Sequence, residues 1–288
     1  MNSLDSYRCF GQSDAMISRV LRIQISISLC SAILFLSCFE LRGGDSKPVL
    51  LYSRYYNAEG EERYLPDGTY SAVIKQLSAD FDVRVHAARL SREKLKDVDL
   101  VLISNPSAHP VNGNPPPAKL DAPDRKELLQ FIRNGGGVII MGNQENHNLE
   151  TEKVNQFLNN FGMQWAENYT DAKGLNIPID TPVLGGLKWA YYTGNQIQLT
   201  ESKNVEHWIV QNDLNQPPLN GMRDAEGALL AGAGFGKGRL VVVTDSGWII
   251  NSVLAGRGLG GNLVEKDDNL EIMKRLCLWA SGQLIEVD

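Results

Sequence analysis

The chain of 288 residues carries 28 lysines and arginines against 34 aspartates and glutamates, and 43% of its residues are hydrophobic. These values are ordinary for a folded globular protein and exclude a disordered chain, a collagen and a coiled coil. Without residues 1–44, 24 basic residues face 31 acidic ones, which gives a net charge of −7. We expect no nucleic-acid partner, because phosphate binding relies on clustered lysines and arginines.

The N-terminal segment, residues 1–44, has the pattern of an export signal. An uncharged apolar run from Ile23 to Phe39 follows Arg19 and Arg22 and precedes a polar stretch, as in secretory signal peptides. The run is slightly shorter than the ~20 apolar residues that span a bilayer. This length favours cleavage of the signal over a permanent anchor.

Two features leave the processing of this segment open. Met16 would make a conventional start, so that residues 1–15 are either a mis-assigned extension or a long basic flank of the signal. Cys38 follows a sequence that resembles a lipoprotein cleavage site, although Phe35 and Leu36 depart from that pattern. We expect a secreted or periplasmic protein that contacts a membrane only through an uncleaved signal or a lipidated Cys38.

Three of the four cysteines lie in this N-terminal segment. The fourth, Cys277, stands in the apolar run from Leu276 to Trp279. A single cysteine cannot form an internal disulfide, and this setting predicts a buried thiol, not a nucleophile or a metal ligand.

The folded part begins near Lys47 with alternating strand and helix patterns. Residues 48–53 and 99–104 are continuous apolar runs, which are typical of parallel strands covered on both faces. Between them, residues 68–80 place apolar side chains at helical spacing, and residues 81–86 alternate as a strand.

The clearest unit is a helix followed at once by a strand. Asp121 is a candidate N-cap, an apolar stripe follows from Leu128 to Ile132, and Gly135 ends the helix. Residues 138–141 (VIIM) then form a strand. This order is the return half of a β-α-β crossover, so the strands 48–53, 99–104 and 138–141 should be parallel neighbours.

The second half of the chain predicts fewer regular elements. A helix is expected over about 150–161, and residues 164–227 read as a mixed β elaboration with strands near 195–200 and 207–211. Residues 228–233 and 239–244 form the strands of a hairpin, and a final helix spans about 268–280. We therefore predict a single α/β domain over 45–288, with a mostly parallel sheet that has helices on both faces, in a flavodoxin-like arrangement.

Several of these segments together carry a family resemblance. The capped helix with GGGVIIMGN (135–143), the late hairpin GAGFGKGRLVVVTDSGWIIN (232–251) and the closing helix after Asp268 resemble the class I glutamine amidotransferase-like superfamily. The match is to exported members of unknown function that are related to gliding-motility auxiliary proteins and to GIFT-type domains. In catalytic members, the turn after the strand that matches 138–141 carries a cysteine nucleophile. Here that turn is Gly142–Asn143–Gln144–Glu145 and has no cysteine, so the resemblance implies no glutaminase activity.

Polar side chains follow the predicted parallel strands, where ligands bind in open α/β sheets. A hydrolase would need an acid, a base and a nucleophile or metal within hydrogen-bond reach of one another. The candidate catalytic residues are Glu145, His147, His109 and Asp245. The candidate ligand-binding residues are Asn105, Asn143, Asp245, Ser246, Trp248 and Asn251.

Structural interpretations compete with these site hypotheses. A divalent metal could bind Glu145 and His147 together with His109 or Asp245, but the spacing matches no closed zinc pattern, so we expect no metal site. Ser246 lacks the G-x-S-x-G elbow of a serine nucleophile, and capping of the following segment by Asp245 and Ser246 is favoured.

Two glycine clusters are most simply loops. Residues 256–261 fit the dinucleotide pattern G-x-G-x-x-G but neither follow a strand nor open a helix, and residues 232–238 fit a hairpin turn better than a phosphate loop.

The sequence thus favours an exported amidotransferase-like domain without a catalytic cysteine. It would act as a ligand-binding or scaffold module of the cell envelope, with no cofactor, and would bind an envelope protein or a small molecule such as a carbohydrate. The alternative is an extracytoplasmic hydrolase of carbohydrates or esters that uses the carboxylate and histidine candidates at the strand ends.

Overall fold

The computed structural model describes residues 46–144, 146–166, 170–200, 205, 207–211, 227–256 and 267–284, without the side chains of 170–176 and 211. The expected signal segment 1–44, the candidate Glu145 and the glycine cluster from residue 257 on lie outside the described residues. Residues 47–288 cluster as one compact unit.

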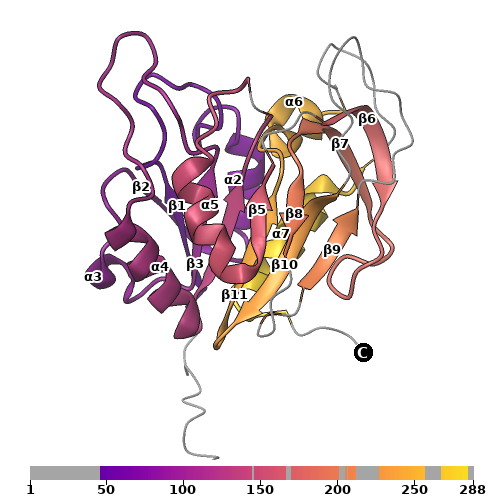
Figure 1. Cartoon of the computed structure of the whole chain (residues 1–288). Coiled ribbons are helices and arrows are strands. Elements are labelled where there is room, and N and C mark those ends of the chain that lie inside the picture. Colours follow the sequence, from indigo (N-terminus) through magenta and orange to yellow (C-terminus); the bar gives the residue numbers. More distant parts are fainter. Residues whose placement is uncertain are drawn as a thin grey trace, which may run out of the picture. The chain divides into compact units, whose positions relative to one another are not determined.

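A nine-stranded mixed sheet forms the centre of the molecule (Figure 1). Five neighbouring strands in the order β2-β1-β3-β4-β11 are all parallel. Every residue of β1, β3 and β4 is buried, as their continuous apolar runs predict. The expected parallel neighbours are therefore confirmed, with bounds β1 (Val49–Ser53), β2 (Asp82–His86), β3 (Leu100–Ser104), β4 (Gly137–Met141) and β11 (Gly238–Val243).

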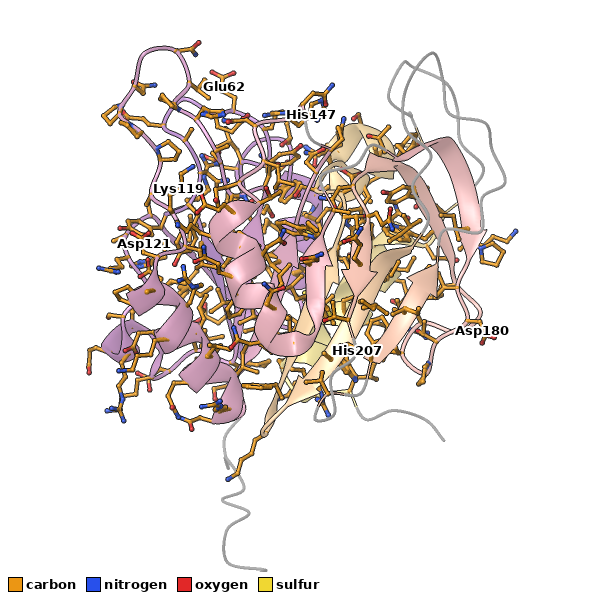
Figure 2. All side chains as sticks on the ribbon, in the orientation of Figure 1. Glu62, Lys119, Asp121, His147, Asp180 and His207 are labelled. Carbon is orange, nitrogen blue, oxygen red and sulfur yellow. The ribbon has the colours of Figure 1, made fainter. Side chains whose placement is uncertain are left out.

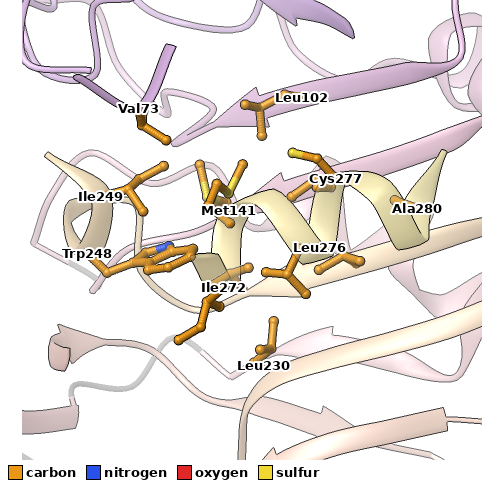
Figure 3. Close-up of a cluster of buried hydrophobic side chains, with 14 of the residues drawn as sticks. Val73, Leu102, Met141, Leu230, Trp248, Ile249, Ile272, Leu276, Cys277 and Ala280 are labelled. Carbon is orange, nitrogen blue, oxygen red and sulfur yellow. The ribbon is translucent and has the colours of Figure 1, made fainter. Parts of the chain in front are cut away.

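Helices cover both faces of the parallel strands (Figure 1). Side chains of α2 (Ser71–Leu77) and α7 (Asn269–Ala280) join the hydrophobic cluster on one face, and those of α4 (Ala122–Arg133) and α5 (Glu152–Leu158) join the cluster on the other. Figure 3 shows Cys277 of α7 on the side of Leu102 and Met141, and Leu276 on the side of Leu230. The predicted α/β class with helices on both faces is confirmed, and Cys277 is a buried free thiol.

The antiparallel half of the sheet continues from β11. The hairpin strand β10 (Ala228–Phe235) pairs with β11 on one side and with β8 (Ile197–Leu199) and β9 (His207–Gln211) on the other, and β5 (Met163–Trp165) pairs with β8. A separate two-stranded sheet consists of β6 (Thr170–Pro178) and β7 (Lys188–Gly194). The sequence predicts the hairpin, β8 and β9, but not β5 or the β6–β7 pair.

Short turns complete the elements. The 3-10 turns η1 (Asn159–Phe161) and η2 (Gly247–Ile249) follow α5 and β11, α3 (Arg92–Leu95) follows β2, and α6 (Asn251–Leu254) follows η2. The helix expected over 68–80 is shorter, because Tyr70 and Ser71 donate their backbone N–H groups to Leu65 and Gly68 in turns. The helix expected over 150–161 ends as η1 at Gly162, which has a φ of +66°.

The joint between α4 and β4 permits almost no side-chain volume. Asp121 is the residue before α4, as predicted, but its side chain makes no capping hydrogen bond, and Gly135 has a φ of +115° beyond the helix end. A Cβ at Gly137 would overlap the backbone of Ala280, and one at Gly238 would overlap the backbone oxygens of Ile132 and Gly136. The ends of α4 and α7 therefore pack closely, backbone against backbone, on the strands β11 and β4.

Asn269, at the start of α7, connects three separate parts of the fold. Its side-chain oxygen accepts the N–H of Ala190 at 2.9 Å, and its amide donates to the carbonyls of Ala190 (3.0 Å) and Trp248 (2.7 Å). We expect Asn269→Ala to lower the free energy of unfolding by about 2–4 kcal/mol, because three buried backbone groups lose a partner. Denaturant unfolding measures this, with the exposed Asn134→Ala as a control that changes stability by less than about 0.5 kcal/mol. Equal losses in the two variants would contradict this assignment.

Within the described ranges, no helix combines the length and the apolar character required to cross a bilayer.

Candidate functional site

The carboxyl ends of β1, β3, β4 and β11 meet at one edge of the sheet. Asn105 follows β3, Asn143 follows β4 by two residues, and Asp245 follows β11 by two residues. All three side chains are buried. Figure 2 shows His147 above this edge. The strand ends thus form a polar layer that covers the end of the hydrophobic core.

His147 makes hydrogen bonds through both ring nitrogens. Its Nδ1 lies 3.1 Å from the side-chain oxygen of Asn143, and its Nε2 lies 3.1 Å from the side-chain nitrogen of Gln144. Since the oxygen accepts and the amide donates, Nδ1 carries the proton and Nε2 accepts, which is the neutral imidazole. Burial, followed by the charge of Arg63, lowers the pKa of His147, in agreement with the neutral form.

Asn143, in the turn after β4, makes several hydrogen bonds. Its side-chain amide donates to the hydroxyl of Tyr64 at 2.5 Å, its side-chain oxygen also accepts the N–H of Gln144, and its backbone oxygen accepts from Asn195 at 2.8 Å. Gln144 in turn accepts a hydrogen bond from Thr193 at 3.2 Å. The turn after β4 is therefore held from several sides by a hydrogen-bonded network.

Asp245 is a buried carboxyl group with an uncommon charge state. Burial raises the pKa of Asp245 to about 7, against the opposing effect of nearby backbone N–H groups. Its Oδ1 accepts the N–H of Gly247 at 2.7 Å, whereas its Oδ2 has no hydrogen-bond partner among the described residues. A buried carboxyl oxygen of this kind can accept a donor from a ligand or from water.

Three tyrosines, Tyr52, Tyr64 and Tyr70, pack together in the hydrophobic cluster on one face of the sheet, and two of them, Tyr64 and Tyr70, lie near Asp245. The hydroxyl of Tyr52 donates to the backbone oxygen of Tyr64 at 2.6 Å, and that of Tyr70 donates to the backbone oxygen of Ser246 at 2.5 Å. Burial raises the pKa of Tyr64 and of Tyr70, and the charge of Asp245 adds to both shifts. The aromatic rings contact one another, with centroids 5.5 Å apart for Tyr64 and Tyr70.

An ion pair lies at the outer rim of this layer. Arg63 donates to both carboxylate oxygens of the buried Glu61, at 2.8 and 2.5 Å, and one of its amino groups lies 3.4 Å from the backbone oxygen of His147. Burial raises the pKa of Glu61, but the hydrogen bonds from Arg63 outweigh it, so the pKa of Glu61 is lowered. The rim thus presents a paired carboxylate and a half-exposed guanidinium.

Backbone strain is present at two positions of the layer. Asn105 and Tyr64 have φ angles of +43° and +63°, a region that only glycine and, less often, asparagine adopt readily. The side-chain nitrogen of Asn105 lies 3.3 Å from the backbone oxygen of His147, and its side-chain oxygen has no partner among the described residues. Such strain is concentrated at functional sites in proteins generally.

The structure separates the other sequence candidates from this cluster. His109 is exposed, and its backbone N–H and C=O bond to the side chain of Asn148. Ser246 is buried and its hydroxyl donates to the backbone oxygens of Met141 (3.2 Å) and Gly142 (2.8 Å). Trp248 lies in the core, with its ring 5.6 Å from that of Trp189. Asn251 bonds to Gly68, Ser71 and Ala72 at the start of α2.

These contacts assign structural roles to Ser246, Trp248 and Asn251. The capping interpretation is confirmed for Asp245, which accepts the backbone N–H of Gly247 in the turn after β11, and is wrong for Ser246, whose hydroxyl makes no capping hydrogen bond and donates to the backbone of β4 and the turn after it. Within the described residues, no group of three histidine, cysteine or acidic side chains is placed to bind a metal ion.

Four members of the layer were not predicted from the sequence, namely Tyr64, Gln144, Thr193 and Asn195. Tyr64 belongs to a polar loop whose aromatic residues gave the only local signal, and Thr193 and Asn195 come from the β elaboration. The roles of Thr193 and Asn195 depend on contacts with Gln144 and Asn143 in the turn after β4, which lies more than 45 positions earlier in the sequence.

Comparisons with known proteins show similarity in structure. No protein-family model and no curated protein sequence matches the chain. Among solved structures, the mmIFT52 N-terminal domain aligns with a TM-score of 0.57 and 14% identity, over 83% of this chain and 100% of that domain. A putative ThuA-like protein from Bacteroides uniformis aligns with a TM-score of 0.48 and 13% identity, over 82% and 93% of the two chains. A putative ThuA-like protein from Parabacteroides merdae aligns with a TM-score of 0.44 and 15% identity, over 84% and 93%.

At these identities, the likeness to the mmIFT52 domain shows that the α/β fold is shared, and it assigns no activity.

Proposed function

We propose that the protein is an exported, non-catalytic amidotransferase-like domain that binds a ligand or a protein partner in the cell envelope. The observation that supports this most directly is the network around Asn143. The turn after β4, which by the resemblance would carry the nucleophile, has a buried asparagine and no cysteine, and His147 uses both ring nitrogens to hold Asn143 and its neighbour Gln144 in place. A base and a nucleophile need freedom to exchange protons with a substrate, which these groups lack.

The polar layer also indicates the chemistry of the ligand. Asp245 and Asn105 each present a buried oxygen without a partner among the described residues, and Arg63 stands at the rim. Such oxygens accept hydrogen bonds from the hydroxyl or amine groups of a ligand. A guanidinium donates hydrogen bonds to an acidic or hydroxyl-rich ligand. A small polyhydroxylated molecule such as a sugar, or a polar loop of a partner protein, meets these requirements.

One observation favours the alternative, an extracytoplasmic hydrolase. A carboxyl group with a pKa near 7, as for Asp245, is suited to proton transfer at neutral pH. Among the described residues near it, the hydroxyls of Ser246 and Tyr70 already donate to backbone oxygens, so neither is free to act as a nucleophile. The alternative therefore requires an attacking water molecule.

A ligand screen by thermal unfolding tests the proposal. Purified protein from expression of the full chain is heated with panels of sugars, amino acids, nucleotides and divalent metals. A ligand at about 100 times its dissociation constant adds ~2.7 kcal/mol, which raises the midpoint by roughly 5–10 °C for a chain of this size. We expect a sugar or amino acid to give such a shift, and we expect Asp245→Ala and His147→Ala to abolish it.

His109→Ala is the matched control, because His109 is exposed and separate from the layer. A shift that survives in the Asp245 and His147 variants would place the ligand elsewhere. Hydrolysis of a glycoside or ester panel that disappears in Asp245→Ala would replace the proposal with the hydrolase. A panel without shifts would contradict small-molecule binding, and capture of an envelope protein sensitive to Arg63→Ala would then support the scaffold role.

A further inference from the structure

The strand β2 forms one end of the nine-stranded sheet and pairs only with β1 among the described residues. Asp82 donates its backbone N–H to Pro48, and His86 accepts from Arg54, both next to β1. In a parallel pair, the N–H and C=O of one residue point to the same side and alternate along the strand. The backbone groups of Val83 and Val85 therefore point away from β1 and are available to another strand.

The same strand carries the most exposed large apolar side chain of the described residues. Val85 is 57% exposed, and the next is Leu199 of β8 at 40%. Val83 packs partly against the hydrophobic cluster that lies under α2 and α7. An unpaired strand edge with an exposed apolar side chain is a template for pairing with another strand.

The charges of β2 complement those of a second β2 strand. Asp82 and Arg84 lie on the opposite face from the valines, joined by an ion pair of 2.6 Å, with both side chains about half exposed. Like charges along an edge repel a second copy, which is one way in which proteins protect their edges. When two identical strands run antiparallel, an acidic and a basic residue two positions apart can each lie opposite the residue of opposite charge on the other strand.

We propose that β2 is a dimerisation edge, which pairs antiparallel with β2 of a second copy of this chain around a two-fold axis. In the register that places Val83 opposite Val83 of the second copy, Asp82 lies opposite Arg84 of the other strand, and the reverse holds by symmetry. The outward N–H and C=O groups of Val83 bond across the axis, and Val85 is covered by apolar side chains of the second copy. The two sheets then continue as one, and the same surface patch serves both copies.

The oligomeric state of the protein, expressed from the full chain, tests this proposal. Light scattering after size-exclusion chromatography, together with sedimentation over a wide concentration range, should show a reversible dimer. A short edge gives a small interface, so the dissociation constant should be on the order of micromolar. Asp82→Arg places two basic residues on each edge and should weaken the dimer about tenfold or more, and Val85→Lys should do the same.

A charge-swap variant distinguishes pairing from general destabilisation. Asp82→Arg combined with Arg84→Asp restores the self-complementary pattern with the signs exchanged, so it should return the dissociation constant to within about threefold of the original. Leu199→Lys introduces the same lysine at the other exposed apolar side chain and should leave the dimer unchanged. A monomer at all concentrations, or a dimer indifferent to Asp82→Arg and Val85→Lys, would overturn the proposal. The ligand screen is independent of this result, because Val85 and Asp82 are not part of the polar layer.

Discussion

Between about pH 4 and pH 8, the buried carboxyl group of Asp245 is expected to lower the free energy of unfolding of the natural protein by about 4 kcal/mol. The Asp245→Asn variant should not show this decrease. Burial raises the pKa of Asp245 from 3.8 to about 7 in the folded state, and each unit of difference corresponds to ~1.4 kcal/mol. The folded state therefore binds the proton more tightly than the unfolded chain. Its contribution is fully present below pH 4 and is lost as the pH rises through about 7.

The neighbours of Asp245 do not reverse this sign. The pKa values of Tyr64 and Tyr70 are raised, so both phenols stay uncharged over this range. His147, whose pKa is lowered, contributes in the opposite direction, since its folded neutral form loses stability as the pH falls. Because this contribution is common to both proteins, the difference between the natural protein and the variant isolates Asp245.

Denaturant unfolding at several pH values measures this difference. Below about pH 4 the carboxyl group of the natural protein is protonated and uncharged, as the amide of the variant is. The variant should then be as stable as the natural protein, or slightly less stable because the amide replaces the hydrogen bonds of the protonated carboxyl group imperfectly. Toward pH 8 the variant should become the more stable of the two. A difference that stays constant from pH 4 to pH 8 would show that Asp245 keeps an ordinary pKa in the folded protein.

Gly238→Ala is expected to destabilise the fold by about 3 kcal/mol or more. A methyl group at this position would overlap two backbone oxygens, those of Ile132 at the end of α4 and Gly136 at the start of β4. Backbone atoms held in a helix and a sheet cannot move aside as a flexible side chain does, so the strain spreads into both elements. The expected loss is a large part of the stability of an ordinary domain.

Gly234→Ala in the same hairpin is the matched control. A Cβ at Gly234 meets no atom within 4 Å, so this variant should differ from the natural protein by less than about 0.5 kcal/mol. Thermal or denaturant unfolding of both variants gives the comparison. Equal stability of the two variants would mean that the contact between β11 and the end of α4 is loose.

The parallel strands β1, β3 and β4 follow from local sequence, whereas β5 and the β6–β7 pair do not. Residues 49–53, 100–104 and 137–141 are continuous apolar runs that only a strand covered on both faces can accommodate, and their order predicts their pairing. The strand β5 is three residues long, which is too short for a periodic signal. It pairs with β8, whose place depends in turn on a contact with β10, which comes about 30 residues later in the chain than β8.

The location of the candidate site was predictable, and the direction of its side chains was not. Strand ends mark the edge of the sheet, so Asn105, Asn143 and Asp245 are found there as expected. Beyond Asp245, however, the chain turns through η2, which directs Trp248 into the core and Asn251 toward α2. A single tight turn decides which residues face the edge, and composition does not encode it.

The position of β11 between β4 and β10 has a consequence for the order of folding. This strand joins the parallel and antiparallel halves of the sheet, yet it is formed by residues 238–243, near the end of the chain. The two halves of the sheet cannot join until β11 has been synthesised, and pairing over such sequence distances folds slowly. If the chain is exported as proposed, this order would leave the two halves of the sheet unjoined while the segments before β11 are translocated.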